Sequence, residues 1–220
     1  INTGIGVEET REFVRETCGE QGWPLKEYFA TDQGSSYRDM VLEKGFPGPW
    51  YHTRMYTKLK DLALAQLVRE HKSRKPDEIV LISGVRSAES QRRMGSVKPM
   101  NRHYARLWVA PIHRWTREDC TVYLDNEGLR RNPVAEKLGR SGECLCGAYA
   151  RKGELDTLEK HYPNTAAQIR DLEKEVKARG FTWGWEEAPP RGWRDSNLKK
   201  MFKDMDNPNP LCQDCSKSKL

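Results

Sequence analysis

The chain has 220 residues, of which 32% are charged and 36% hydrophobic, and it carries a formal net charge of +6 at pH 7. This composition excludes an intrinsically disordered chain and predicts a soluble protein with one modest core and a polar C-terminal extension. No apolar run approaches the ~20 residues of a membrane span, and no secretory signal segment is visible, so we expect a reducing, cytoplasmic setting without membrane contact.

The first third of the chain has mainly helical patterns. Residues 1–4 resemble the end of a strand that enters a glycine turn, and we therefore expect part of the fold upstream of Ile1. The spacing of apolar residues and the stop signals predict four elements: a helix over 8–21, a short strand over 23–29, and helices over 35–44 and 54–71.

Two later segments, 77–84 and 106–111, have the apolar runs of strands buried in a sheet. Strands that alternate with helices indicate a parallel sheet covered on both faces. We therefore expect an α/β, Rossmann-like fold with its ligand at the carboxyl ends of the strands.

Basic residues follow the first of these strands. Gly84 and Arg86 come directly after it, and an arginine fork can hold a phosphate by two parallel hydrogen bonds. A helix N-terminus behind the turn would add backbone N–H groups. Arg86 is therefore predicted to bind phosphate, while Arg92 and Arg93 either assist it or belong to a solvated basic helix.

Arg54 and Lys58 form a second basic pair. Residues four apart share one face of a helix, so the two side chains either converge on one anion or remain solvated surface charges.

The cysteines carry the strongest chemical signal. Cys144 and Cys146 are separated by one residue, and Cys212 and Cys215 by two. Together they make a complete four-sulfur site for an iron-sulfur cluster or a zinc ion. The remaining two, Cys18 and Cys120, lie within helical patterns, where a free thiol usually packs as a small apolar group.

Tryptophans and basic residues alternate over residues 181–203. One interpretation is nucleic-acid binding, because bases stack on aromatic rings while basic groups meet phosphates. We favour the other, in which Trp183, Trp185 and Trp193 hold the tail over the metal site and the sheet edge.

Several motifs occur in a fixed order: Asn2-Thr3-Gly4 with Glu9-Thr10, Arg54 with Lys58, Gly84-x-Arg86-x-x-Glu89-Ser90, Pro111-Ile112-x-x-Trp115-Thr116-x-x-Asp119, and Asn132-Pro133 with Leu138-Gly139-x-Ser141-Gly142. In this order they resemble the phosphoadenosine phosphosulfate (PAPS) reductase family over roughly residues 1–160. The resemblance implies a parallel sheet of the adenine nucleotide alpha-hydrolase type. It also implies that the nucleotide and its phosphates are bound by Asn2, Thr3, Gly4, Gly84, Arg86, Glu89 and Ser90.

The chain departs from the family pattern at both ends. The family's phosphate loop, a Ser-Gly-Gly-Lys-Asp-Ser type sequence after the first strand, would precede Ile1. The reactive cysteine of the reductases' C-terminal Glu-Cys-Gly-Leu-His type segment has no counterpart after Cys215. We expect an adenine-nucleotide-binding domain over residues 1–140, without its first strand, and a helical extension over 141–220 that is rich in Trp and basic residues and holds the metal.

Three functions remain open. The first is ATP-dependent activation of an acceptor with release of pyrophosphate, followed by transfer of sulfur from a donor protein to DNA, tRNA or a small molecule. Arg86, Arg54 and Lys58 would then neutralise phosphate charge, and magnesium would accompany the nucleotide. The second is a sulfonucleotide reductase, which attacks PAPS or a related substrate with a thiolate and releases sulfite. The third is a metal-stapled nucleotide-binding subunit without catalysis.

The cysteine pattern also resembles the iron-containing branch of the family, in which a near-adjacent pair and a distant Cys-x-x-Cys pair hold a 4Fe-4S centre. This resemblance favours iron-sulfur over zinc at Cys144, Cys146, Cys212 and Cys215.

Overall fold

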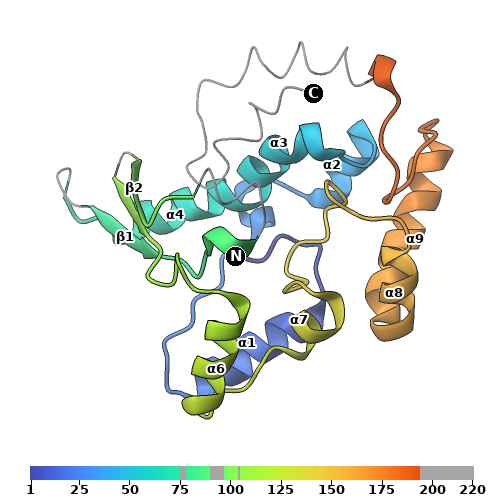
Figure 1. The fold of residues 1–220 in the computed structure, drawn as a ribbon. Coiled ribbons are helices and arrows are strands. Elements are labelled where there is room, and N and C mark those ends of the chain that lie inside the picture. Colours follow the sequence, from blue (N-terminus) through green and yellow to red (C-terminus); the bar gives the residue numbers. More distant parts are fainter. Residues whose placement is uncertain (75–77, 90–96, 104, 194–220) are drawn as a thin grey trace. The chain divides into compact units, whose positions relative to one another are not determined.

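The computed structural model describes residues 1–74, 78–89, 97–103 and 105–193 (Figure 1). They separate into two compact units, the first containing residues 1–63 and 132–193 and the second residues 64–131. No helix in these described ranges is long and apolar enough to cross a membrane. The helices and strands are α1 (Glu8–Glu20), α2 (Tyr37–Lys44), α3 (His52–Tyr56), α4 (Leu62–His71), β1 (Ile79–Ile82), β2 (Met100–His103), β3 (Arg106–Val109), α6 (Arg117–Asn126), α7 (Pro133–Leu138), α8 (Glu154–His161) and α9 (Pro163–Ala178).

The helices predicted over 8–21, 35–44 and 54–71 are confirmed as α1, as α2 and as the run from α3 to α4. In the last of these, a π-helical turn over Thr57–Asp61 interrupts the α-helix. Such turns shift the side-chain register of a helix and occur often at functional sites. Leu59 lies within the turn and is buried in the core.

Polar caps fix two helix starts in the motifs that the sequence singled out. At α6, the Thr116 hydroxyl accepts from the Asp119 N–H at 3.0 Å, and the Asp119 carboxylate accepts from the Thr116 N–H at 2.7 Å. At α7, the side chain of Asn132 accepts from the backbone and Pro133 occupies the first turn. These local bonds satisfy N–H groups that have no partner within the helix.

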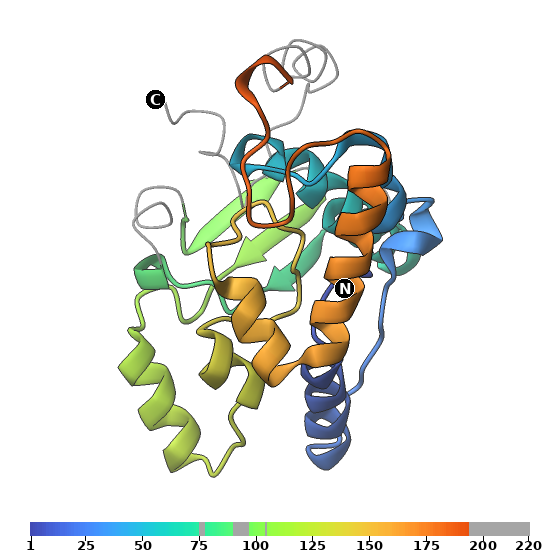
Figure 2. The same ribbon diagram turned by 90° about the vertical axis from the view of Figure 1, so that its right-hand side faces the viewer.

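The core of the first unit contains side chains from two separate parts of the chain, residues 5–59 and residues 134–185. Figure 2 shows α8 and α9 as an antiparallel pair, joined through Tyr162. Their apolar faces meet side chains from residues 1–63 and from the segment after α9. The core includes Val7, Val41, Phe46, Met55, Leu155, Leu158, Ile169, Leu172, Val176, Trp183 and Trp185.

The strand predicted over 23–29 is wrong. This segment makes a single parallel bridge, between Phe29 and Asn2. Two backbone hydrogen bonds close it, from the Asn2 N–H to the Tyr28 carbonyl at 2.8 Å and from the Ala30 N–H to the Asn2 carbonyl at 3.0 Å. Its would-be partner turns away at Gly4, where φ is +75°, so the ladder cannot continue.

The second unit contains a three-stranded sheet in the order β1-β3-β2. β1 pairs with β3 in parallel, whereas β2 pairs with β3 antiparallel. The α/β class is confirmed, but the expectation of a purely parallel sheet is corrected. Only residues 104–105 separate β2 from β3, and a parallel connection needs a crossover of about a dozen residues.

The expected cover on both faces of the sheet is also corrected for β1. Val80 and Ile82 are 55% and 76% exposed, although they belong to the most apolar strand of the sequence.

Candidate functional site

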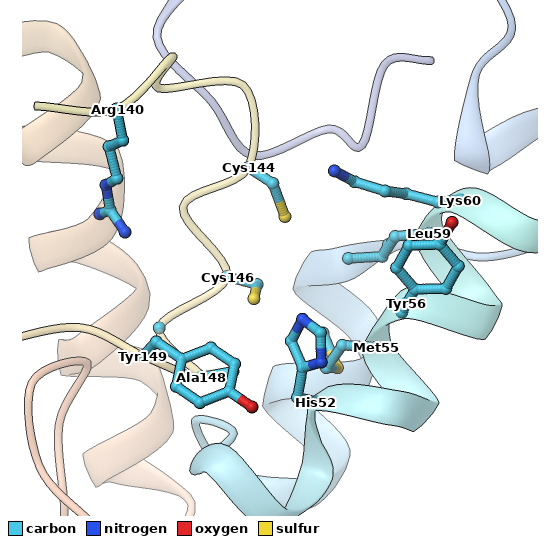
Figure 3. Close-up of a pocket in the computed structure, with 11 residues that line it drawn as sticks. His52, Met55, Tyr56, Leu59, Lys60, Arg140, Cys144, Cys146, Ala148 and Tyr149 are labelled. Atoms are coloured by element: carbon cyan, nitrogen blue, oxygen red, sulfur yellow. The ribbon is translucent and has the colours of Figure 1, made fainter. Parts of the chain in front are cut away.

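Cys144 and Cys146 lie on the loop after α7, and both line a cavity of about 110 Å³ in the first unit (Figure 3). The opposite side of the cavity is formed by α3 and the π-helical turn. Figure 3 shows the Lys60 side chain extending towards Cys144, while His52 lies opposite Cys146. The cavity is lined by His52, Met55, Tyr56, Leu59, Lys60, Arg140, Cys144, Cys146, Gly147, Ala148 and Tyr149.

The N-terminal segment holds the cysteine loop in place. The Leu145 N–H donates to the Ile5 carbonyl at 2.9 Å, and the Val7 N–H donates to the Gly142 carbonyl at 2.9 Å. The buried Thr3 hydroxyl lies 3.2 Å from the Glu143 carbonyl oxygen, which it can reach as a donor. These bonds join residues 135 to 140 positions apart, so the cysteines depend on the N-terminal segment for their position.

Gly6 is required for this close approach, because a Cβ there would overlap the backbone carbonyl of Glu143. We expect Gly6→Ala to lower the free energy of unfolding by about 1–3 kcal/mol, the usual effect of overpacking. Gly19→Ala in α1 is the matched control, since no atom lies within 4 Å of its added Cβ. The control should stabilise by about 0.5–1 kcal/mol. Equal urea midpoints for the two variants would contradict the close contact.

The cysteine pair is electrostatically asymmetric. The Cys146 thiol donates to the Cys144 sulfur and so lowers the pKa of Cys144; Lys60 and the Thr3 hydroxyl act in the same direction, against the effect of burial. The pKa of Cys146 is raised well above its usual value, because its thiol is hydrogen-bonded to the Cys144 sulfur and is buried. The pair therefore presents one thiolate, the form in which cysteine binds metals and attacks electrophiles.

Of the four cysteines predicted to bind a metal, the structure describes Cys144 and Cys146. Cys144 and Cys146 offer two sulfur ligands on one loop that line the same cavity, which suits a soft metal or an iron-sulfur cluster. Cys212 and Cys215 lie outside the described residues. Within those residues, no group of three or more His, Cys, Asp or Glu is placed to hold a metal.

Trp183 and Trp185 anchor the segment after α9. They are 5% and 1% exposed, and their indole N–H groups donate to the carbonyls of Phe46 at 2.9 Å and Leu145 at 2.7 Å. These contacts support the predicted role of the two tryptophans as anchors and leave neither ring available to stack on a base. Trp193 packs against Trp183, with ring centroids 5.0 Å apart.

Arg86 follows β1 as predicted, but its guanidinium is already engaged within the protein. Nε lies 3.7 Å from the Glu89 carboxylate, and Nη1 donates to the Trp115 carbonyl at 3.4 Å. Arg86 and Glu89 were both predicted at the phosphates, and the structure pairs them with each other. Gly84 has room for a side chain, and Ser90 lies outside the described residues with Arg92 and Arg93.

The other predicted site residues are not among those that line the cysteine cavity. Asn2 accepts from the Gly4 N–H at 2.9 Å and shapes the N-terminal turn. Arg54 and Lys58 belong to the correct helix but are absent from the cavity lining, which contains Lys60 instead. The π-helical turn changes the register along this helix, and nothing in the sequence indicates that turn.

Cys18 on α1 and Cys120 on α6 are half-buried free thiols, as their helical context predicted. Neither lines the cavity that contains Cys144 and Cys146.

The fold is of the α/β class, and two thiols lie together in one cavity, an arrangement that suits sulfur chemistry. A family model described as the phosphoadenosine phosphosulfate reductase domain matches residues 1–146, and the chain belongs to this family of nucleotide-using enzymes of sulfur metabolism. The match includes Cys144 and Cys146 and ends before the second cysteine pair. A search of curated proteins found no match.

Proposed function

We propose that this chain uses ATP to activate an acceptor, with release of pyrophosphate, and that sulfur is then transferred to the acceptor, a nucleic acid or a small molecule. Membership of the family supports nucleotide use in sulfur metabolism. The observation that carries the finer proposal is the Cys144 and Cys146 pair in one cavity with Lys60. If both thiols bind a metal centre, the cavity offers no further described thiol to act as the nucleophile of a reductase.

In this proposal Cys144 and Cys146, together with Cys212 and Cys215, hold a 4Fe-4S cluster or a zinc ion. Such a centre, when bound, supplies a site at which sulfur species coordinate. Lys60 stabilises negative charge in the cavity, as it does for the Cys144 thiolate.

The phosphate-binding residues remain part of the proposal. Arg54 and Lys58 would neutralise phosphate charge from the helix beside the cavity, and magnesium would accompany ATP. Arg86 would have to exchange its contact with Glu89 for a phosphate oxygen, since Glu89 now lies 3.7 Å from its Nε.

Product analysis tests the proposal. Purified protein should release pyrophosphate from ATP in the presence of acceptor and sulfur source, with one pyrophosphate formed for each sulfur transferred. The same preparation is incubated with PAPS and assayed for sulfite. Sulfite without pyrophosphate would identify a reductase, and neither product would identify a nucleotide-binding subunit; each result would contradict sulfur transfer.

A sulfonucleotide reductase is the second candidate, favoured by the position of two thiols on one loop of the cavity. The Cys144 thiolate would attack the substrate sulfur and break its bond to the phosphate oxygen, so that the nucleotide leaves. Cys146 would then attack the Cys144 sulfur, its thiol proton passing to the departing sulfite, and form a disulfide that an external dithiol reduces. A Cys144–Cys146 disulfide peptide formed only after addition of PAPS would support this route.

A further inference from the structure

A second cavity of the first unit, of about 540 Å³, has a basic lining. It lies where the end of α7, the loop after it and the start of α8 meet. Four cationic side chains line it, Lys137, Arg140, Arg151 and Lys152, and Glu154 is the one carboxylate among its described lining residues.

The nearby carboxylates are already engaged. Glu154 accepts from the Arg151 backbone N–H at 3.0 Å and pairs with the Arg140 guanidinium. Glu186 accepts from the Gly153 N–H at 3.1 Å and from the Leu155 N–H at 2.5 Å, so the first amides of α8 are occupied as well. A ligand in this cavity would therefore meet cationic side chains rather than the helix terminus.

Arg151 and Lys152 supply the uncommitted charge. Both residues are exposed, and neither side chain has an ion-pair partner in the part of the chain that the structure describes. Lys137 is placed differently, with its ammonium 5.7 Å from the centre of the Tyr162 ring. The cavity thus keeps an excess of positive charge after its internal contacts are counted.

The basic cavity adjoins the cysteine cavity. Arg140 and Tyr149 line both. Tyr149 is 38% exposed, and its ring lies 4.9 Å from that of His52, across from Cys146 (Figure 3). Arg140 and Tyr149 therefore form a wall common to the two cavities, and a ligand anchored in the basic cavity would lie next to the cavity that contains the thiols.

We propose that the basic cavity binds a phosphate group of the sulfur acceptor and directs the acceptor towards Cys144 and Cys146; this inference rests on the proposed function. Arginine forks match phosphate oxygens in pairs, and lysine adds a point charge. Ligand pockets usually measure about 300–1,000 Å³, a range that includes this cavity. The phosphate belongs either to the backbone of a nucleic acid or to a small phosphorylated molecule, and both share the chemistry that the cavity recognises.

Binding measurements on the full chain test the proposal. A fluorescein-labelled single strand of about ten nucleotides, within the range of known single-strand sites, is titrated by anisotropy. Ribose 5-phosphate, which has a phosphate group but no adenine for the ATP site, is titrated by calorimetry. The cavity variant combines Arg151→Gln and Lys152→Gln. The control variant combines Lys160→Gln and Lys177→Gln, which removes the same charge from exposed positions on α8 and α9 that do not line the cavity. The cavity variant should bind both probes at least about tenfold more weakly than the control does. For the labelled strand, the plot of log K against log salt concentration should become less steep by about 1.4, the change expected for two lost phosphate contacts.

A loss in the cavity variant confined to the oligonucleotide identifies a nucleic-acid acceptor, and one confined to ribose 5-phosphate identifies a small phosphorylated acceptor. A loss of both probes in the cavity variant alone identifies a site for the shared phosphate group, and all three results support the site. Equal losses in the cavity and control variants, or no binding of either probe by the unaltered protein, would overturn it. Pyrophosphate release by the unaltered protein is measured separately, so failure of this subsite is distinguishable from failure of the proposed function.

Discussion

Cys144→Ser should yield a protein without the iron or zinc that the unaltered protein is expected to carry. Cys144 is the member of the described pair whose pKa is lowered, through the Cys146 thiol and Lys60, and a thiolate is the form that binds metal. A serine hydroxyl does not supply that ligand. Elemental analysis and the visible absorbance of anaerobically purified protein measure the loss.

Cys18→Ser is the matched control, since Cys18 is a free thiol on α1 and does not line the cavity. It should retain the metal. If the two cysteine pairs share one centre, Cys212→Ser should lose metal to the same extent as Cys144→Ser. A brown protein with iron would identify the cluster, and a colourless one with stoichiometric zinc would change the metal but keep its ligands. Full metal content in Cys144→Ser would exclude Cys144 as a ligand and favour the reductase candidate.

The sequence predicts the elements that local signals define. α1 and α2 follow from their apolar spacing, and β1 and β3 from their apolar runs. β2 was missed because Met100–His103 reads Met-Asn-Arg-His, with no alternation typical of a strand. Its conformation depends on pairing with β3, a tertiary contact that local propensity does not reveal.

The candidate site likewise contains residues that the sequence identifies and residues whose role only the structure reveals. The spacing of Cys144 and Cys146 was sufficient to single them out, because the chemistry lies in the residues themselves. Lys60 required the structure, since it is positioned by a π-helical turn. Thr3 was predicted at the nucleotide, and only the structure shows that its hydroxyl reaches the cysteine loop 140 positions away. Arg86 was predicted at the correct end of its strand, but the sequence did not reveal its contact with Glu89.

Trp185→Ala is the second change for which we expect a large effect. The indole is 1% exposed, and its N–H donates to the Leu145 carbonyl at 2.7 Å, between the two cysteines. Removing a buried tryptophan costs about 3–5 kcal/mol. Trp185→Phe keeps most of the volume and should cost about 1–3 kcal/mol, because the carbonyl loses its donor. Chemical denaturation measures both variants, and Trp23→Ala, at a position 53% exposed, is the control and should stay within about 0.5 kcal/mol of the unaltered protein.

The same substitution separates two ways of holding the segment after α9. One way is through the metal centre: metal binding to thiolates can supply folding free energy, so the order of this segment would then depend on the bound metal. Burial of Trp183 and Trp185 leads to a different expectation for residues 181–185. They should resist limited proteolysis in Cys212→Ser and become cleavable in Trp185→Ala. Cleavage within 181–185 in Cys212→Ser would instead show that the metal centre holds them.

Trp185→Ala should also weaken metal binding by about tenfold or more, as loss of a supporting contact usually does. The reason is that the Trp185 indole donates a hydrogen bond to Leu145, the residue between Cys144 and Cys146.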